Sequence, residues 1–292
     1  VVLGTTACGK SGLGVELAKR FDGEVISADS RQVYKGLDLG TGKVTEAEME
    51  GIPHHMLDVV EPGQPYSVAD FQPAAYAAID DVLARGKVPI LVGGTGLYVR
   101  AVTEGFQFSD SKPDPALRQE LEGKSNAELY AILREKTGVT LTGGEENNRH
   151  RLMRSVEKAL SGGWEAPRAC PRYDCLLLGV NFPRDVVCAR IDQRLQARID
   201  AGMLDEVAGL RAAGVSDAFL DRLGLEYRYI LWYLTGKIPT LEGLKDELGR
   251  AIKRFAKRQV VWFKKDKDVL WLDMEGDFLS QAGDAVERFL SA

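Results

Sequence analysis

The sequence predicts an α/β fold in which helices flank a parallel sheet and a small helical insertion domain interrupts the chain. Three observations lead to this prediction. Short apolar runs alternate with stretches of helical periodicity, as in βαβ units. The first apolar run leads directly into a glycine-rich segment, residues 4–11. Between about residues 105 and 171 the apolar runs disappear, and only helical periodicity remains.

Six apolar runs are the candidate strands of the sheet. They cover residues 1–3, 24–28, 56–60, 88–92, 175–180 and 269–272. Helical periodicity predicts a helix from Pro73 to Arg85, after a capping box at Ser67 and Asp70. Long helices are expected over residues 184–213 and 251–264. The sheet would belong to a discontinuous catalytic core, residues 1–104 and 172–292, around an insertion of residues 105–171.

The glycine-rich segment reads Gly-Thr-Thr-Ala-Cys-Gly-Lys-Ser, which is the pattern G-x-x-x-x-G-K-[ST] between an expected strand and an expected helix. In that setting backbone N–H groups and the helix N-terminus face an anion. Lysine adds a full positive charge, and serine a hydroxyl for Mg²⁺. The core is therefore expected to be P-loop NTPase-like and to bind a di- or triphosphate. The expected binding residues are Gly4, Thr6, Ala7, Cys8, Gly9, Lys10 and Ser11.

Composition limits the class of protein. The chain has 292 residues, of which 45% are hydrophobic and 28% charged, so a packed core is expected. No apolar run approaches the ~20 residues of a membrane span, and no membrane partner is expected. The four cysteines form no C-x-x-C pair, which indicates a reducing cytoplasm and no structural zinc. The net charge of −5 disfavours a globally basic nucleic-acid binder but allows a local basic patch.

Asp29 follows the second expected strand, and Gly93-Gly94-Thr95-Gly96 follows the fourth. Ligands of open α/β sheets lie outside the carboxyl ends of the strands, so Asp29 should face the phosphate loop. It could act there as a general base or a metal-linked acid, or it could simply cap a following helix. The glycines indicate either close approach of the backbone to a bulky group or a tight turn.

Two sets of basic residues each crowd one expected helix. Arg190, Arg194 and Arg198 recur every four residues, so they could clamp a diphosphate together, or they could pair with Asp192 and Asp200 on a solvated face. The second set fits nucleic-acid phosphates, or again a solvated helix face. It consists of Arg250, Lys253, Arg254, Lys257, Arg258, Lys264 and Lys265. His54 and His55 are adjacent, so their side chains point apart and a metal site is disfavoured there.

Taken together, these segments resemble the bacterial tRNA dimethylallyltransferases, also called tRNA isopentenyltransferases. The matching segments, spread from Val1 to about Phe263, are GTTACGKS, SADSRQVYKGLDLGTGKV, GIPHHMLDVVEPGQPYSVADF, PILVGGTGLYVRAV, RIDQRL and AKRQVVWF. The chain departs from the family at Thr5, where proline is usual, and at residues 223–228, where IGYK or VGYR is usual. The insertion also looks short.

The resemblance implies transfer of a dimethylallyl group from dimethylallyl diphosphate to the N6 amine of the adenine next to the anticodon in tRNA. It implies that Thr6 binds the bridging oxygen, that Asp29 accepts the amine proton, and that Arg194 and Mg²⁺ near Ser11 stabilise the diphosphate. The insertion would contact the anticodon stem-loop. The expected tRNA-binding residues of the core are Ser30, Gln32, Thr95, Tyr98, Arg254, Lys257, Arg258 and Gln259.

Two other functions stay open at this point. A prenyltransferase could act on free adenine nucleotides, and the phosphate loop taken alone would also fit a P-loop kinase or ATPase. The basic helix and the insertion argue for a polymeric acceptor. The sequence carries no signal for oligomeric state, and a monomer in the cytoplasm is expected.

Overall fold

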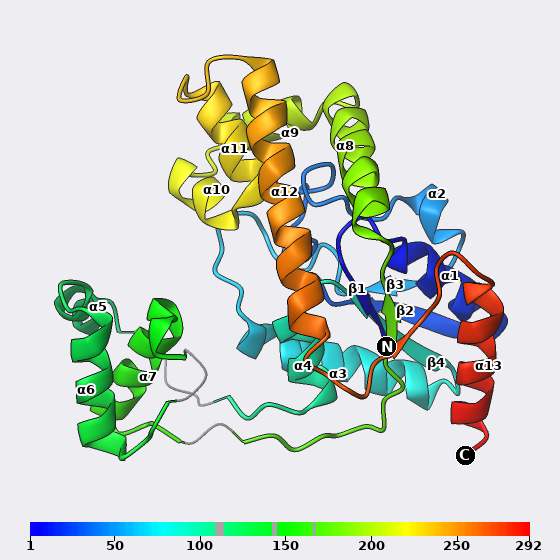
Figure 1. Ribbon diagram of the computed structural model, residues 1–292, viewed down its shortest axis with the longest axis horizontal. Coiled ribbons are helices and arrows are strands. Elements are labelled where there is room, and N and C mark those ends of the chain that lie inside the picture. Colours follow the sequence, from blue (N-terminus) through cyan, green and yellow to red (C-terminus); the bar gives the residue numbers. More distant parts are fainter. Residues whose placement is uncertain (109–113, 142–144, 166–167) are drawn as a thin grey trace. The chain divides into compact units, whose positions relative to one another are not determined.

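The chain folds into two compact units, residues Val1–Glu104 with Pro171–Ala292, and residues Gly105–Cys170. The fold is that of a computed structural model, which describes residues 1–108, 114–141, 145–165 and 168–292 (Figure 1). The first unit holds the sheet and differs from the expected core, 1–104 and 172–292, by the single residue Pro171. None of the helices in the described ranges is both long and apolar enough to cross a membrane.

The first unit is built on a six-stranded parallel sheet in the order β3-β2-β4-β1-β5-β6. Val2 of β1 lies opposite Val92 of β4 and Leu178 of β5. The glycine-rich loop that follows β1 therefore starts near the middle of the sheet, which confirms the P-loop NTPase-like prediction. The strands are β1 Val2–Gly4, β2 Gly23–Ser27, β3 His54–His55, β4 Val88–Gly93, β5 Leu178–Val180 and β6 Leu270–Trp271.

The third strand lies earlier than predicted. The sequence predicts it over residues 56–60, but only His54 and His55 pair with β2. Met56 and Asp58 have positive φ angles of 64° and 54°, so the backbone turns there instead of continuing the sheet. Met56 fills the core beside the sheet. The residues that follow pair with the segment 32–34 instead, through the N–H groups of Asp58 and Val59 and a parallel bridge between Val60 and Tyr34.

Helices cover both faces of the sheet, as the near-continuous apolar strands of a parallel sheet require. Successive strand residues alternate between two cores: Val25 joins α1 and α13 on one face, whereas Ile26 joins α3 and α4 on the other. The capping box at Ser67 is confirmed, but α3 begins at Val68, and Pro73 lies inside the helix. The helices are α1 Lys10–Arg20, α2 Glu46–Met49, α3 Val68–Ala84, α4 Gly96–Thr103 and α13 Phe278–Leu290.

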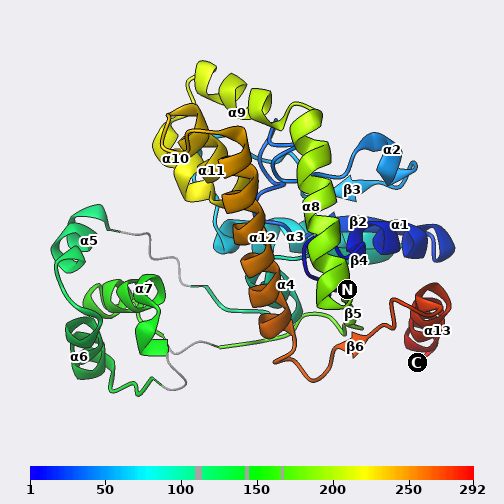
Figure 2. The ribbon, with the colours of Figure 1, turned by 45° about the horizontal axis from the view of Figure 1, so that its top comes forward.

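A helical layer beyond the sheet has a third core of its own, in which Val33 and Leu37 also take part. The expected helix over residues 184–213 is two helices, because Gly202 has φ 97° and ends one before the other starts. The expected helix over 251–264 begins ten residues earlier, after the cap Thr240. The helices are α8 Arg184–Asp200, α9 Met203–Ala212, α10 Asp217–Leu223, α11 Leu225–Leu234 and α12 Leu241–Phe263. Figures 1 and 2 show α8 and α12 side by side.

The second unit is a small helical domain with a separate core. Its ends meet, because the N–H of Cys170 donates to the carbonyl of Gly105 at 3.0 Å and Phe106 forms an antiparallel bridge with Ala169. Leucines 121, 129, 133 and 152 fill the core. The elements are α5 Pro115–Glu122, α6 Asn126–Thr137, the 3₁₀ helix Glu145–Asn147 and α7 Arg149–Leu160.

A buried carboxylate ties the edge of the sheet to the end of α3. Glu24 of β2 is 2% exposed, accepts two hydrogen bonds from Arg85, and lies 2.7 Å from Nε2 of His55. The bonds from Arg85 are the main reason why the pKa of Glu24 falls from 4.5 to about 2. The carboxylate therefore stays charged in the folded protein down to strongly acidic pH.

Replacing Glu24 by glutamine should lower the free energy of unfolding by about 1–2 kcal/mol at pH 7, a figure reduced because solvent screens the partly exposed Arg85. The folded-state pKa lies below the unfolded one, so this stabilisation is present above pH 4.5 and is lost as the pH falls toward 2. Urea unfolding at pH 7 and pH 3 should show a difference between wild type and Glu24→Gln that shrinks with acid. The control Asp81→Asn removes an exposed partner of Arg85 and should change the free energy of unfolding little. A difference between wild type and Glu24→Gln that stays constant across pH would contradict the lowered pKa of Glu24.

Candidate active site

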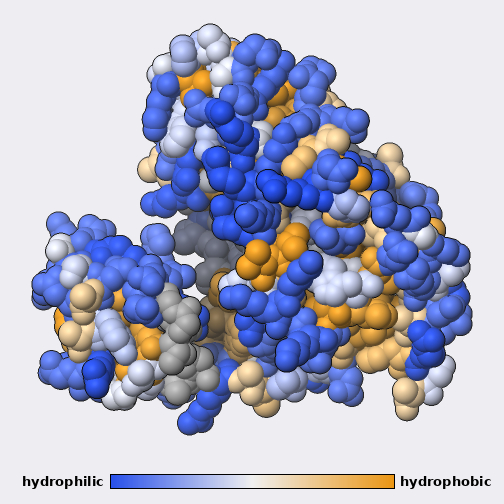
Figure 3. Space-filling view, in the orientation of Figure 1, coloured by the Kyte–Doolittle hydropathy of each residue, from blue (hydrophilic) through white to orange (hydrophobic). Residues whose placement is uncertain are grey.

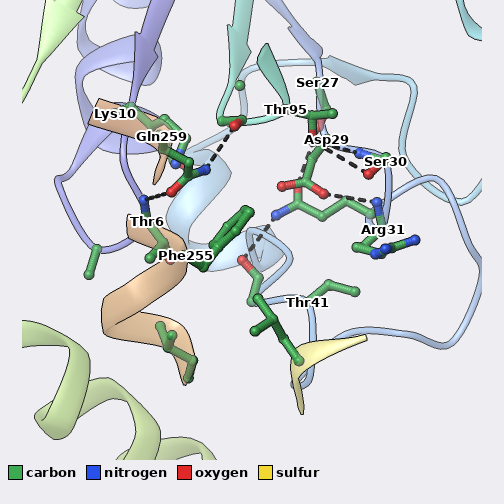
Figure 4. Close-up of a pocket in the computed structure, with 18 of the residues that line it drawn as sticks. Thr6, Lys10, Ser27, Asp29, Ser30, Arg31, Thr41, Thr95, Phe255 and Gln259 are labelled. Carbon is green, nitrogen blue, oxygen red and sulfur yellow. Dashed lines mark hydrogen bonds between the residues drawn. The ribbon is translucent and has the colours of Figure 1, made fainter. Parts of the chain in front are cut away.

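A cavity of about 1020 Å³ opens at the carboxyl ends of β1, β2 and β4, beneath α8, α11 and α12. All residues that line it belong to the first unit. Figure 4 shows the phosphate-loop residues on one side of the cavity and Asp29 with its neighbours on the other. The cavity brings together most of the residues predicted from the sequence, namely Thr6, Ala7, Gly9, Lys10, Ser11, Asp29, Ser30, Gln32, Thr95, Arg194, Arg258 and Gln259.

Some predicted residues lie elsewhere. Tyr98 was expected to contact tRNA, but it faces the core. It is 5% exposed and stacks on Phe71 with ring centroids 4.3 Å apart. Gly4 and Cys8 are buried and do not line the cavity. The thiol of Cys8 donates to the carbonyl of Thr5 at 2.8 Å.

The phosphate loop has the form that its sequence predicts. Gly9 has φ 85° and is the N-cap of α1, which begins at Lys10. The ammonium of Lys10 donates to the carbonyl of Thr5 at 3.1 Å, and Ser11 is exposed to the cavity. A helix N-terminus, a lysine and a serine hydroxyl thus meet at one wall, which is an arrangement that binds phosphate groups.

Gln259 of α12 braces this loop from the side. Its carbonyl oxygen accepts the N–H of Thr6 at 2.9 Å, and its amide nitrogen donates to the carbonyl of Gly94 at 2.8 Å. A Cβ on Gly94 would lie 2.7 Å from that nitrogen, so the glycine after β4 serves close approach. Gln259 is 7% exposed and its amide is used twice, so in this structure its side chain serves the phosphate loop and the turn after β4.

Asp29 is held in an open position opposite the loop. Its Oδ1 accepts the N–H of Arg31 at 2.9 Å, and a turn over residues 30–33 follows, so Asp29 is not the cap of a helix. No hydrogen-bond partner for Oδ2 is found among the residues that the structure describes, which leaves this oxygen available to a ligand. Thr95 accepts the N–H of Ser30 at 3.1 Å and so joins the turn after β2 to the turn after β4.

The arginines of α8 face the same cavity. Arg190 lies over the ring of Phe182 at 3.9 Å, and Arg198 lies 3.7 Å from Glu226. The pairing with Asp192 and Asp200 on a solvated face does not form: Asp192 accepts from Lys253, and Asp200 from Gln196. The structure therefore favours the clamp over the solvated face.

The surroundings of Arg194 lower its pKa, first because the cavity walls remove water from the guanidinium, and second because Arg198 lies close. Arginine still keeps its proton under these conditions. The positive charge of Arg194 is therefore poorly balanced by the protein alone. An anionic ligand in the cavity would neutralise it.

Three further residues that line the cavity, Glu226 and the aromatic Phe255 and Trp262, were not predicted from the sequence. Burial is the main reason why the pKa of Glu226 rises, and Arg198 opposes that rise. For Glu226, the one signal in the sequence was the departure from the usual family pattern at residues 223–228. Phe255 and Trp262 carried no signal, because apolar positions of a helix ordinarily face a core.

The basic residues of α12 divide into two groups. Arg250 pairs with Asp246 at 2.8 Å and Lys253 with Asp192 at 2.7 Å, so both are neutralised locally. Arg254 and Lys257 are exposed outside the cavity and have no ion pair with any residue in the described ranges, while Arg258 reaches the cavity. Figure 3 shows mostly hydrophilic side chains over this helical layer.

The two histidines take separate partners, as their adjacency predicts. His55 contacts Glu24, and Nδ1 of His54 lies 2.9 Å from the carbonyl of Ile52. Within the described residues, no group of three histidine, cysteine or carboxylate side chains is arranged to hold a metal ion.

Comparison with known proteins agrees with the geometry. A model of the family described as IPP transferase matches residues 32–266, and one described as isopentenyl transferase matches residues 1–61. A tRNA dimethylallyltransferase of an Exiguobacterium species is 42% identical over 283 residues, which is 94% of this chain and 89% of that protein. A tRNA dimethylallyltransferase 2 of Shewanella sediminis is 43% identical over 97% of this chain and 95% of its own length.

Solved structures resemble the fold over its whole length. A tRNA isopentenylpyrophosphate transferase from Bacillus halodurans superposes with a TM-score of 0.75 at 35% identity, over 99% of this chain and 94% of that one. A eukaryotic dimethylallyltransferase acting on tRNA gives 0.80 at 27% identity, over 99% and 78%. With a family match over most of its length and relatives above 40% identity, the chain belongs to the IPP transferase family.

Proposed function

We propose that this protein transfers a dimethylallyl group from dimethylallyl diphosphate to the N6 amine of the adenine 3′-adjacent to the anticodon in tRNA. Diphosphate is the second product. The observation that carries the proposal is the cavity, in which a phosphate loop and the α8 arginines face the carboxylate of Asp29. The names of the relatives, tRNA dimethylallyltransferases, support the same reaction.

On the donor side the loop acts on a leaving group. When the amine attacks the allylic carbon, the carbon–oxygen bond breaks and its electron pair goes to the diphosphate. Loop N–H groups, Lys10 and Arg194 would stabilise the negative charge that develops there. Thr6 lies on the same wall, where its hydroxyl can donate to the bridging oxygen.

On the acceptor side Asp29 is the general base. The lone pair of the adenine amine is delocalised into the ring, so attack leaves a cationic nitrogen that must lose a proton. The open Oδ2 of Asp29 would take it. Gln32, Ser30 and Thr95 line the cavity beside Asp29 and would read the edge of a flipped-out base.

The residues fit a magnesium ion bound mainly through the substrate. Mg²⁺ in phosphate sites keeps several waters and uses one or two protein oxygens together with phosphate oxygens. Ser11, at the start of α1 and exposed to the cavity, would supply the protein oxygen. The ion, when bound, would neutralise charge on the departing diphosphate.

The exposed cations of α12 and the insertion would hold the tRNA. Arg254, Lys257 and Arg258 would contact its backbone and set affinity, and the helical unit of residues 105–170 would contact the anticodon stem-loop.

We place the reaction in the cytoplasm, which agrees with four free cysteines. We also propose a monomer.

One assay separates this reaction from its alternatives. Labelled dimethylallyl diphosphate is incubated with the enzyme and tRNA, with AMP, or with neither. Label in tRNA alone is expected. Label in AMP would indicate a prenyltransferase of free nucleotides, and ATP hydrolysis without any prenyl transfer would indicate a kinase or ATPase.

The variant Asp29→Asn should keep the fold and bind the donor normally but slow single-turnover transfer by ~10²-fold or more, because the amide cannot accept the proton. Rapid-quench kinetics with labelled donor and saturating tRNA measure the effect. The control Asp284→Asn removes an exposed carboxylate of α13 outside the cavity lining and should leave the rate within about twofold. A near-normal rate for Asp29→Asn would reduce that residue to a turn-forming role.

The double variant Arg254→Glu with Lys257→Glu should raise the KM for tRNA and leave the donor KM unchanged. Removing a side chain that binds one phosphate should also flatten the salt dependence of tRNA binding by about one unit of slope. Filter binding over a series of salt concentrations measures both effects on affinity. The control Lys245→Glu with Lys267→Glu makes the same change in net charge away from the cavity. Equal effects of the two pairs would show that only net charge matters.

A further inference from the structure

The loop of residues 38–42 forms one wall of the cavity, through Gly40, Thr41 and Gly42. It lies against the charged groups of the site. A Cβ on Gly42 would lie 1.7 Å from Nη2 of Arg198 and 3.1 Å from Nη2 of Arg194. The backbone of this wall is therefore packed directly against the two guanidiniums.

The same loop also orients Gln32. The carbonyl of Gly42 accepts from Nε2 of Gln32 at 3.2 Å, while Oε1 of Gln32 accepts from the hydroxyl of Ser27 at 3.2 Å. These two bonds fix which way the amide faces. Gln32 lines the cavity three residues beyond Asp29, so the position of Gly42 determines how the amide is presented to a base.

One carboxylate outside the cavity lining holds this loop. Oε2 of Glu206, on α9, accepts the N–H groups of Asp38 and Leu39 at 2.9 and 2.6 Å. Oε1 accepts the N–H of Gly40 at 3.0 Å and the hydroxyl of Tyr227 at 2.7 Å. Three successive backbone N–H groups thus converge on one anion, and charge-assisted bonds of this kind are stronger than neutral ones.

Tyr227 completes the arrangement. Its side chain is buried, and a Cβ on Gly40 would lie 2.5 Å from its Cζ. Burial and then the charge of Glu206 raise the pKa of the phenol, so it stays protonated and donates. Glu206 forms no ion pair with any residue that the structure describes, so its charge is balanced by the loop and this phenol.

We propose that Glu206, supported by Tyr227, is a positioning residue for the transfer reaction. It acts through the backbone of residues 38–42, which sets the amide of Gln32. The phosphate loop is braced independently by Gln259, and the two arginines are carried by α8, so the effect of Glu206 should fall on the acceptor side. The inference rests on the proposed function only for its kinetic part.

The first experiment needs no substrate. Hydrogen–deuterium exchange of the whole protein should show faster exchange at residues 38–42 in Glu206→Gln than in wild type, because an amide nitrogen cannot accept the loop N–H groups. The matched control is Asp205→Asn, an exposed carboxylate on the preceding residue of the same helix. Unchanged protection of the loop in Glu206→Gln would overturn the proposal, whatever reaction the protein catalyses.

The second experiment is kinetic. Glu206→Gln should lower kcat by ~10-fold or more, since small misplacements of reacting groups are costly, and leave the donor KM within about threefold. Tyr227→Phe keeps the ring and removes the hydrogen bond to Glu206, so it should lower kcat by a smaller factor. It replaces Glu206→Gln as the test variant if Glu206→Gln folds poorly. Asp205→Asn should match wild type. A kcat within twofold of wild type for both variants would overturn the proposal.

A double-mutant cycle distinguishes positioning from a general loss of stability. If Glu206 acts through Gln32, then Glu206→Gln should cost much less kcat in a Gln32→Ala background than in wild type. Losses that simply add, or that follow the unfolded fraction in a thermal melt, would show a purely structural role. Failure of wild type to label tRNA would instead refute the proposed function and leave the exchange result as the test of the loop.

Discussion

The contact on which the site depends is the side-chain amide of Gln259. It joins three segments distant in sequence: the phosphate loop through Thr6, the turn after β4 through Gly94, and the helix α12 itself. The bond to Gly94 is buried and the bond to Thr6 is partly buried, and a buried polar group without its partner would be strongly destabilising. The helix that carries the exposed cations is therefore fixed to the loop that would hold the diphosphate.

The helical layer holds the two sides of the cavity separately. From α12, Gln259 fixes the donor wall, and from α9 and α11, Glu206 and Tyr227 fix the loop opposite it. The arginines of α8 lie between these walls. In other P-loop proteins the loop can serve a nucleotide triphosphate, but the motif determines only phosphate binding. Here the added layer supplies the α8 arginines and braces both walls, while the acceptor residues Asp29 and Gln32 follow β2.

The sheet and the phosphate loop were predictable because their signals are local. Parallel strands are apolar on both faces, and Gly4–Ser11 has a pattern that few other structures satisfy. Helix ends were less predictable, because each depends on a single capping residue. Gly202 caps the start of α9 and so breaks the expected long helix, and Thr240 caps the early start of α12. Tyr98 was misassigned because a sequence does not show which face of a helix is buried. Glu206 gave no signal, because its partners are backbone N–H groups 166–168 residues away.

The meeting of the two ends of the insertion has an evolutionary consequence. Gly105 and Cys170 are hydrogen-bonded, and the unit between them has its own core. A segment with adjacent ends can be exchanged, shortened or removed by recombination with little disturbance to the sheet, since only a short turn must reconnect the chain. The part proposed to contact the anticodon stem-loop can thus diverge as a cassette, while the cavity that performs the chemistry is inherited unchanged.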